Sequence, residues 1–113
     1  MKDDTLRPLV SVEGGPMSSF NPRQVAAAFG SILRAARTDC GMTQEELAER
    51  ANLDRTYPSL LERGLRQPTI GRLIGIAYAL GVEPGALVTR TVARMWKRLL
   101  EDSGPPEKEL QKM

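Results

Sequence analysis

The chain has 113 residues, of which 41% are hydrophobic and 27% are charged, and its formal net charge is +2. This length suits one domain with tails, and the apolar content is enough for one small core. The single cysteine, Cys40, excludes an intramolecular disulfide, and the lack of histidine leaves a zinc site or a histidine-based triad without its ligands or base.

The sequence also argues against a membrane protein or an enzyme. No apolar run approaches the ~20 residues that span a bilayer, and the first residues, MKDDTLRPL, lack the apolar core of a signal peptide. No phosphate-binding glycine loop is present, and no cofactor is expected. Cys40 is expected to be structural, since no cationic group is obviously aimed at it. We therefore expect a cytoplasmic protein that is not an enzyme.

Residues 1–20 have no hydrophobic periodicity and are predicted to form a flexible arm. A helix is predicted to begin at Asn21 and Pro22, because asparagine is a good cap and proline is favoured at the first helical position. An apolar stripe at helical spacing carries this helix towards Gly41: Val25, Ala28, Phe29, Ile32, Leu33 and Ala36.

The stretch from Met42 to Gly64, MTQEELAERANLDRTYPSLLERG, predicts two short helices joined by a tight turn. Thr43 and Glu46 have the spacing of a capping box, which satisfies two backbone donors at the start of the first helix. Asp54 offers a second N-cap, and Gly64 is a stop signal. Two short helices joined so closely tend to cross steeply, and this arrangement presents the second helix to DNA.

Pro58 leaves the start of the second short helix open. If Asp54 is the N-cap, the proline removes the first intrahelical hydrogen bond. If the helix begins at Thr56 instead, Pro58 falls within its first turn, where proline is tolerated, and Arg55 lies on the preceding turn. The two starts aim Arg55 differently.

Three further helical segments are predicted towards the C-terminus. The first, over residues 69–81, is capped by Thr69 and ended by Gly81. A short helix follows over 83–88, and an amphipathic helix over 91–101. The tail, 103–113, is polar and predicted to be disordered. The predicted fold is all-α, a compact bundle of five short helices over residues 21–88 with a C-terminal helix over 89–102.

Residues 22–88 resemble the lambda-repressor-like helix-turn-helix domain of the Cro and Xre type. The resemblance rests on four motifs that agree in order and spacing, MTQEELAERANL, ERG, RQPT and IAYALGVEPGAL. Pro58 departs from the family pattern, which usually has a branched apolar residue there. The resemblance implies sequence-specific binding of double-stranded DNA, usually by a dimer.

The resemblance also implies roles for single residues. In this family the second short helix enters the major groove with its N-terminal residues towards the bases. Arg55 and Thr56 are then the first base-reading candidates, and Ser59 and Leu60 lie one turn later on the exposed side. For each of them the alternative is an ordinary surface side chain.

Other matching positions are implied to hold the domain on DNA or to hold it together. Arg37 and Glu62 match an ion pair that relatives commonly bury, and we expect them to be structural. The candidates for backbone phosphate contacts lie at the first turn of one short helix and flank the end of the other: Thr43, Gln44, Arg63 and Arg66.

A dimer interface is predicted around the last helix, whose apolar residues exceed what a small bundle needs. Trp96 is the type of aromatic anchor found at interface centres. The alternative is that this helix folds back as extra core. The predicted interface residues are Leu87, Val88, Val92, Met95, Trp96 and Leu99.

Two functions remain after this reading. The first is a bacterial or phage-type transcriptional regulator, a dimeric repressor that binds an inverted repeat. The second is an interaction module, such as an antitoxin or a restriction-modification accessory protein, whose main partner is another protein. The flexible, polar ends favour the regulator.

Overall fold

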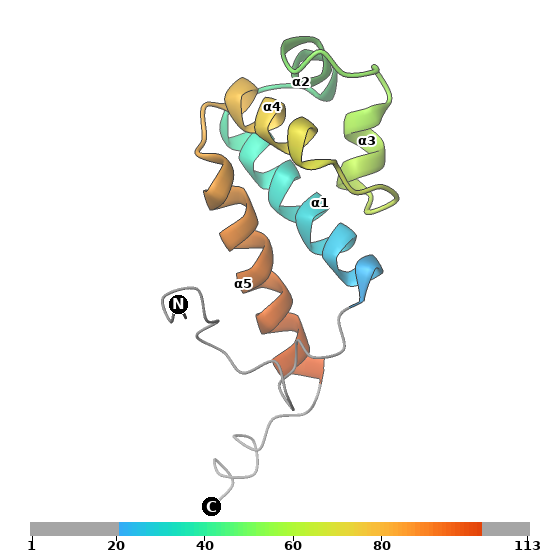
Figure 1. Ribbon diagram of the computed structural model, residues 1–113, viewed down its shortest axis with the longest axis vertical. Coiled ribbons are helices and arrows are strands. Elements are labelled where there is room, and N and C mark those ends of the chain that lie inside the picture. Colours follow the sequence, from blue (N-terminus) through green and yellow to red (C-terminus); the bar gives the residue numbers. More distant parts are fainter. Residues whose placement is uncertain (1–20, 103–113) are drawn as a thin grey trace, which may run out of the picture. The chain divides into compact units, whose positions relative to one another are not determined.

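The computed structural model describes residues 21–102, and every regular element in this range is a helix. The predicted all-α class is confirmed. The predicted arm, 1–20, and tail, 103–113, lie outside the described residues. No single helix between residues 21 and 102 is long and apolar enough to cross a membrane. The helices are α1 (Pro22–Asp39), α2 (Gln44–Arg50), α3 (Tyr57–Glu62), α4 (Ile70–Leu80) and α5 (Pro84–Asp102) (Figure 1).

Residues 21–95 form one compact unit with a single apolar core. Each of its helices buries a large aliphatic side chain completely, and α3 also buries Pro58. Burying an aliphatic side chain of this size stabilises a fold by roughly 1.5–3 kcal/mol. In the second unit the structure describes only residues 96–102, which continue α5. The five large aliphatic side chains, in chain order from α1 to α5, are Leu33, Leu47, Leu61, Ile76 and Leu87.

The predicted caps account for where three helices begin. Asn21 accepts a hydrogen bond from the Arg23 backbone at 2.9 Å. Thr43 and Glu46 form the full capping box of α2, with bonds of 3.0 and 2.8 Å. Thr69 caps α4 by accepting from the backbone of Arg72. These short local bonds satisfy N–H groups that would otherwise lack partners, and each is typically worth about 1 kcal/mol.

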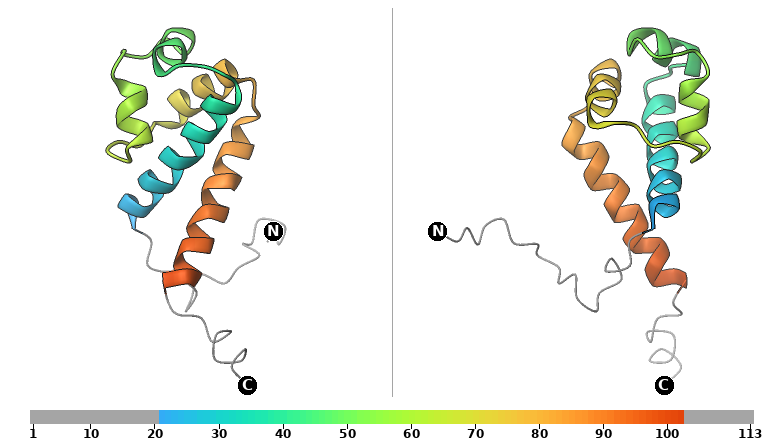
Figure 2. Two further views of the ribbon diagram at one scale, coloured as in Figure 1. Left: turned by 180° about the vertical axis from the view of Figure 1, so that it is seen from behind. Right: turned by 45° about the vertical axis from the view of Figure 1, so that its right-hand side comes forward.

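The two short helices, α2 and α3, cross steeply, since α2 is seen nearly end-on in the view that shows α3 from the side (Figure 2). The turn between them is tight because Asn52 adopts a left-handed conformation, with φ of 57°. Asparagine tolerates this conformation better than most residues do. After α3, the chain turns at Gly64, whose φ is +74°.

The start of α3 follows the later of the two predicted alternatives. The regular helix begins at Tyr57 with Thr56 as N-cap, and Pro58 occupies its first turn. The Asp54 carboxylate accepts from the Thr56 backbone at 3.0 Å, and so caps the preceding turn instead of a regular helix. Because proline lacks an N–H, Pro58 cannot continue the helical ladder back to Asp54. Arg55 therefore lies on the turn.

The helices α1 and α3 pack closely because α1 carries a glycine at their crossing. A Cβ placed on Gly30 would overlap the backbone carbonyl oxygen of Leu61 and lie 2.7 Å from that of Glu62. No other residue permits this approach of two backbones. Gly30 therefore sets how near α3 lies to the longest helix of the compact unit.

The C-terminal segments differ from the sequence prediction in one respect. The short helix predicted over 83–88 and the amphipathic helix predicted over 91–101 form one continuous helix, α5. The one β-branched residue between them, Thr89, lowers helix propensity by only a few tenths of a kcal/mol. Thr91 also returns its hydroxyl to the carbonyl oxygen of Leu87 at 2.8 Å, so its polar group is satisfied within the helix.

Candidate nucleic-acid interface

A shallow concavity lies between the start of α2 and the start of α3. Its volume is about 610 Å³. Six of the eight residues predicted to contact DNA line it, while Leu60 and Arg66 do not. The six, from three short segments of the chain, are Thr43, Gln44, Arg55, Thr56, Ser59 and Arg63.

Arg55 and Thr56 are exposed on the turn that leads into α3. The Arg55 guanidinium pairs with Glu45 of α2, with 3.3 Å between Nη2 and Oε2. The Thr56 hydroxyl donates to the Asp54 carboxylate at 2.6 Å, which leaves the methyl group and the oxygen lone pairs of Thr56 for another contact. Both side chains are exposed and line the concavity.

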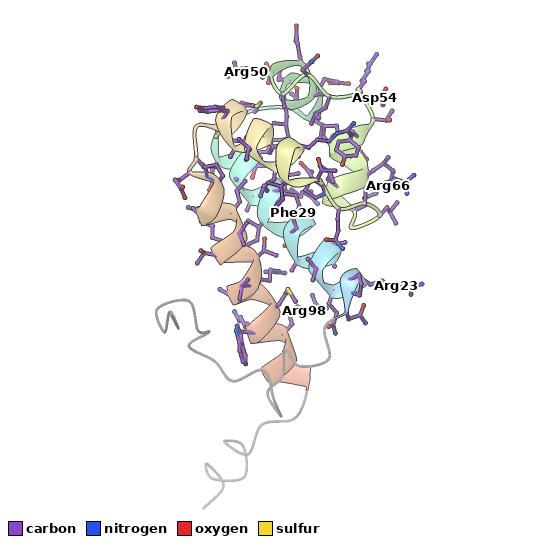
Figure 3. The ribbon with its side chains drawn as sticks, viewed as in Figure 1. Arg23, Phe29, Arg50, Asp54, Arg66 and Arg98 are labelled. Carbon is purple, nitrogen blue, oxygen red and sulfur yellow. The ribbon has the colours of Figure 1, made fainter. Side chains whose placement is uncertain are left out.

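Asp54 holds the turn in place. Hydrogen bonds from the hydroxyl and then the backbone N–H of Thr56 stabilise its carboxylate and lower its pKa. Figure 3 shows Asp54 and Arg66 on the same side of the compact unit, at opposite ends of α3. Asp54 is therefore an ionised group at the edge of the candidate interface.

Ser59 and Leu60 are half-buried, whereas the sequence analysis expected them on the exposed side. Their neighbours in the chain, Pro58 and Leu61, turn inward and are buried. Arg63, the residue that follows the end of α3, donates from Nε to the Ser59 hydroxyl at 3.2 Å and more weakly to the Ser59 carbonyl at 3.4 Å. Ser59 is thus tied to Arg63 on the surface of α3.

The residues predicted to contact phosphates differ in how many of their polar groups are already hydrogen-bonded within the protein. Thr43 uses its backbone N–H and its hydroxyl oxygen in the capping box. The Gln44 amide donates to Glu62 Oε1 at 3.0 Å, which leaves a second N–H on the same nitrogen. Arg66 is exposed in the loop between α3 and α4 and points away from the bundle (Figure 3).

Arg37 and Glu62 form a two-pronged ion pair between α1 and α3. The guanidinium donates to Oε2 at 2.6 Å and to Oε1 at 3.0 Å, and its third bond reaches the Met42 carbonyl at 2.7 Å. The two side chains are 12% and 4% exposed. The hydrogen bonds to Glu62 raise the pKa of Arg37 despite its burial. Such a pair keeps both charges and fixes the angle between the helices.

The predicted dimer residues divide into buried and exposed groups, which corrects the sequence analysis. Leu87 and Met95 are buried at 0% and 5% exposure, so they belong to the core of the compact unit and cannot form an outer surface. Val88 and Val92 are exposed, and Trp96 is half-buried. The Leu99 side chain lies outside the described residues. On α4, Ile70 and Tyr78 are the most exposed large apolar residues within the described range.

Among the contacts that the sequence analysis missed are two that join separate elements near the start of α3. One is the pair between Glu45 and Arg55, which are ten residues apart in the chain. The other is the guanidinium of Arg72, which lies 4.9 Å from the centre of the Tyr57 ring. The periodicity of a single helix signals neither contact, because each joins two elements across a turn or loop.

The helix-turn-helix family profile matches residues 33–87. An HTH-type transcriptional regulator of Sinorhizobium fredii, itself uncharacterised, is 45% identical over 62 residues, which span 55% of this chain and 80% of the relative. The chain belongs to the Cro/Xre-type helix-turn-helix family. Members of this family are DNA-binding transcription regulators, which are not a class of enzymes.

Two further relatives extend the comparison with this family. The immunity repressor protein of Bacillus phage phi105 is 39% identical over 59 residues, which are 52% of this chain but only 41% of the repressor. The restriction-modification controller protein C.Esp1396I, solved as a tetramer in complex with its natural 35 base-pair operator, is 33% identical. It has a TM-score of 0.58 over 64% of this chain and 95% of its own.

Proposed function

We propose that this protein is a sequence-specific, dimeric repressor that binds double-stranded DNA through α3 in the major groove. The observation that carries the proposal is the concavity that gathers exposed Arg55 and Thr56 with Gln44 and Arg63. The C.Esp1396I operator complex and the phage repressor support it as relatives. The protein then acts in the cytoplasm, by occupying DNA that polymerase needs.

The turn before α3 supplies the groups that read bases. Arg55 can donate two hydrogen bonds to O6 and N7 of a guanine, a contact worth roughly 1–3 kcal/mol against another base. The Thr56 methyl suits contact with a thymine methyl. Ser59 and Leu60, being half-buried, contribute to specificity only where a base comes close to the surface of α3.

The phosphate contacts set the register of the domain on DNA and carry no sequence information. The hydrogen bond to Glu62 orients the Gln44 amide, whose remaining N–H can donate to a phosphate. Arg63 and Arg66 place positive charges near the C-terminal end of α3. Thr43 retains its hydroxyl proton as a donor. Each phosphate neutralised adds about 0.9 to the slope of log affinity against log salt.

Dimerisation makes the site long enough to be specific, since paired domains read half-sites roughly 34–36 Å apart. Val88 and Val92 supply an exposed apolar face at one-turn spacing on α5, with 47% and 39% exposure. Trp96 follows four residues later on the same helix. We propose this face as the homodimer contact.

A specific observation favours a second candidate, an interaction module that binds another protein. Ile70, Ile74 and Tyr78 are spaced four residues apart along α4, and all three are exposed. An apolar stripe of this kind on a surface helix is typical of a protein contact. In this alternative α4 holds a protein partner, and DNA binding is secondary.

The test is selection of bound fragments from a random double-stranded DNA pool at near-physiological salt, followed by sequencing. We expect an enriched inverted repeat, with lost preference at one position in Arg55→Ala. Arg50→Ala is the matched control, because Arg50 is an exposed cation of α2 that does not line the concavity. An absence of enrichment would favour the protein-partner candidate.

The dimer is tested separately by analytical ultracentrifugation at micromolar concentration. We expect a dimer for the natural chain and a monomer for Val88→Lys, which places a charge on the exposed face of α5. Thr89→Lys, at the next exposed position, is the control for a charge on the same helix. A monomeric natural chain would refute the proposed dimer and leave the DNA-binding proposal to its own test.

A further inference from the structure

The ion pair between Glu45 and Arg55 joins α2 to the turn before α3 at the candidate interface. The side chains of Arg55 and Glu45 are 80% and 65% exposed, and their closest atoms are 3.3 Å apart. A pair this exposed adds little to the stability of the fold. Its carboxylate also lies on a surface proposed to face the phosphates of DNA, where a negative charge opposes binding.

The pair leaves Arg55 able to bind a base while the Glu45 carboxylate holds it. A guanidinium has five N–H groups, and Glu45 accepts from only one nitrogen, Nη2. Enough donors remain for a two-pronged contact with guanine. At the same time, the negative charge of the Glu45 carboxylate partly cancels the positive charge of Arg55. The attraction of Arg55 to DNA phosphates is therefore weaker.

Of the other carboxylates near the turn, Asp54 and Glu46 are engaged elsewhere, and Glu49 makes no contact with Arg55. Asp54, next to Arg55 in the chain, is occupied by the hydroxyl and backbone N–H of Thr56. Glu46 closes the capping box of α2. Glu49, one turn after Glu45 on α2, makes no side-chain hydrogen bond or ion pair within residues 21–98.

We infer that Glu45 is a positioning residue that directs Arg55 to a base edge and away from phosphates, and so determines specificity. This inference rests on the proposed function. Glu45 would increase the discrimination between DNA sequences and lower the affinity for DNA in general. Phosphate attraction is the same for every sequence, whereas the base contact is not. Orienting the base contact widens the gap between a correct and an incorrect site, and weakening the phosphate attraction lowers the affinity for both.

The test compares Glu45→Gln with Glu49→Gln, which removes the same charge one turn away. Dissociation constants are measured over a salt series for the selected site and for that site with the Arg55-dependent base pair replaced. For Glu45→Gln we expect the ratio of the two constants to fall about two- to fivefold, the range available to an exposed pair. We also expect tighter binding to random DNA and a salt slope steeper by about 0.9, as a released Arg55 takes a phosphate.

The control and a double variant separate the possible explanations. Glu49→Gln should tighten binding to all sequences alike and leave the ratio unchanged. In an Arg55→Ala background, Glu45→Gln should have no further effect on the ratio. Thermal melts of each variant establish that it folds, which is expected because both glutamates are exposed.

An unchanged ratio in Glu45→Gln, in a protein where Arg55→Ala does lose its preference, would overturn this inference and leave the proposed function intact. An equal fall in Glu45→Gln and Glu49→Gln would also overturn it, since charge alone would then be the cause. If Arg55→Ala retains every base preference, the proposed base-reading role of Arg55 fails, and this inference fails with it.

Discussion

Removing Arg37 should test how much the buried ion pair between α1 and α3 stabilises the fold. Arg37→Ala deletes three hydrogen bonds, of 2.6, 2.7 and 3.0 Å. It leaves the 4%-exposed Glu62 carboxylate with Gln44 as its remaining described partner. An uncompensated charge of this kind typically costs about 3–5 kcal/mol. Small domains are stable by only about 5–15 kcal/mol, so the variant should be marginally folded.

Urea unfolding followed by circular dichroism measures this loss. With an m-value of about 1–1.5 kcal/mol per molar urea, the midpoint should fall by roughly 2–5 M. Arg34→Ala, three residues earlier on α1 and exposed, is the matched control and should change stability by less than about 0.5 kcal/mol. The double variant Arg37→Met with Glu62→Leu should recover most of the stability, because two apolar residues leave no charge unpaired.

Two results would refute this reasoning. The first is Arg37→Ala as stable as Arg34→Ala, which would mean that solvent or neighbouring groups compensate Glu62. The second is a double variant no more stable than Arg37→Ala, which would mean that packing volume and not unpaired charge causes the loss. A lost DNA preference in Arg37→Ala is informative only in conditions where the variant is folded.

Three other predictions follow from named contacts. Gly64→Ala should destabilise the fold by about 1–3 kcal/mol in urea unfolding, because its φ is +74° and the new Cβ would lie 3.1 Å from the Cα of Ala27. Arg66→Ala should weaken binding to all DNA sequences alike and reduce the salt slope by about 0.9, measured by titration at several salt concentrations. The lowered pKa of Asp54 means that its carboxylate stabilises the fold above its unfolded pKa of about 3.9, and that this stability is lost as pH falls through the lower folded value. Asp54→Asn should therefore flatten the acid end of a plot of melting temperature against pH, and an identical plot for both proteins would contradict the role of Asp54.

Features fixed by bonds between near neighbours could be predicted from the sequence. The capping box of Thr43 and Glu46 and the cap at Thr69 depend on spacings of three residues, and both occur as predicted. The start of α3 was only narrowed to two alternatives, because the choice depends on how Pro58 packs as well as on its missing N–H. Its burial among the core residues is a tertiary property.

Features fixed by packing could not be predicted in the same way. An apolar stripe indicates that a helix has a sheltered face, but not whether its own domain or another molecule shelters it. Leu87 and Met95 were therefore assigned to an interface although they are buried in the core. The contact of Glu45 with Arg55 was missed for a related reason, since it exists only once the turn has brought α2 and α3 together.

The close approach at Gly30 has a consequence for exchanging the specificity of this domain. Gly30 meets the backbone of α3 at Leu61 and Glu62, and not the outward side chains of that helix. The docking of α3 is therefore insensitive to which residues its outer surface carries. New reading residues could be grafted at positions 55 and 59 on the same backbone, provided that Gly30 and the turn held by Asp54 and Thr56 are kept.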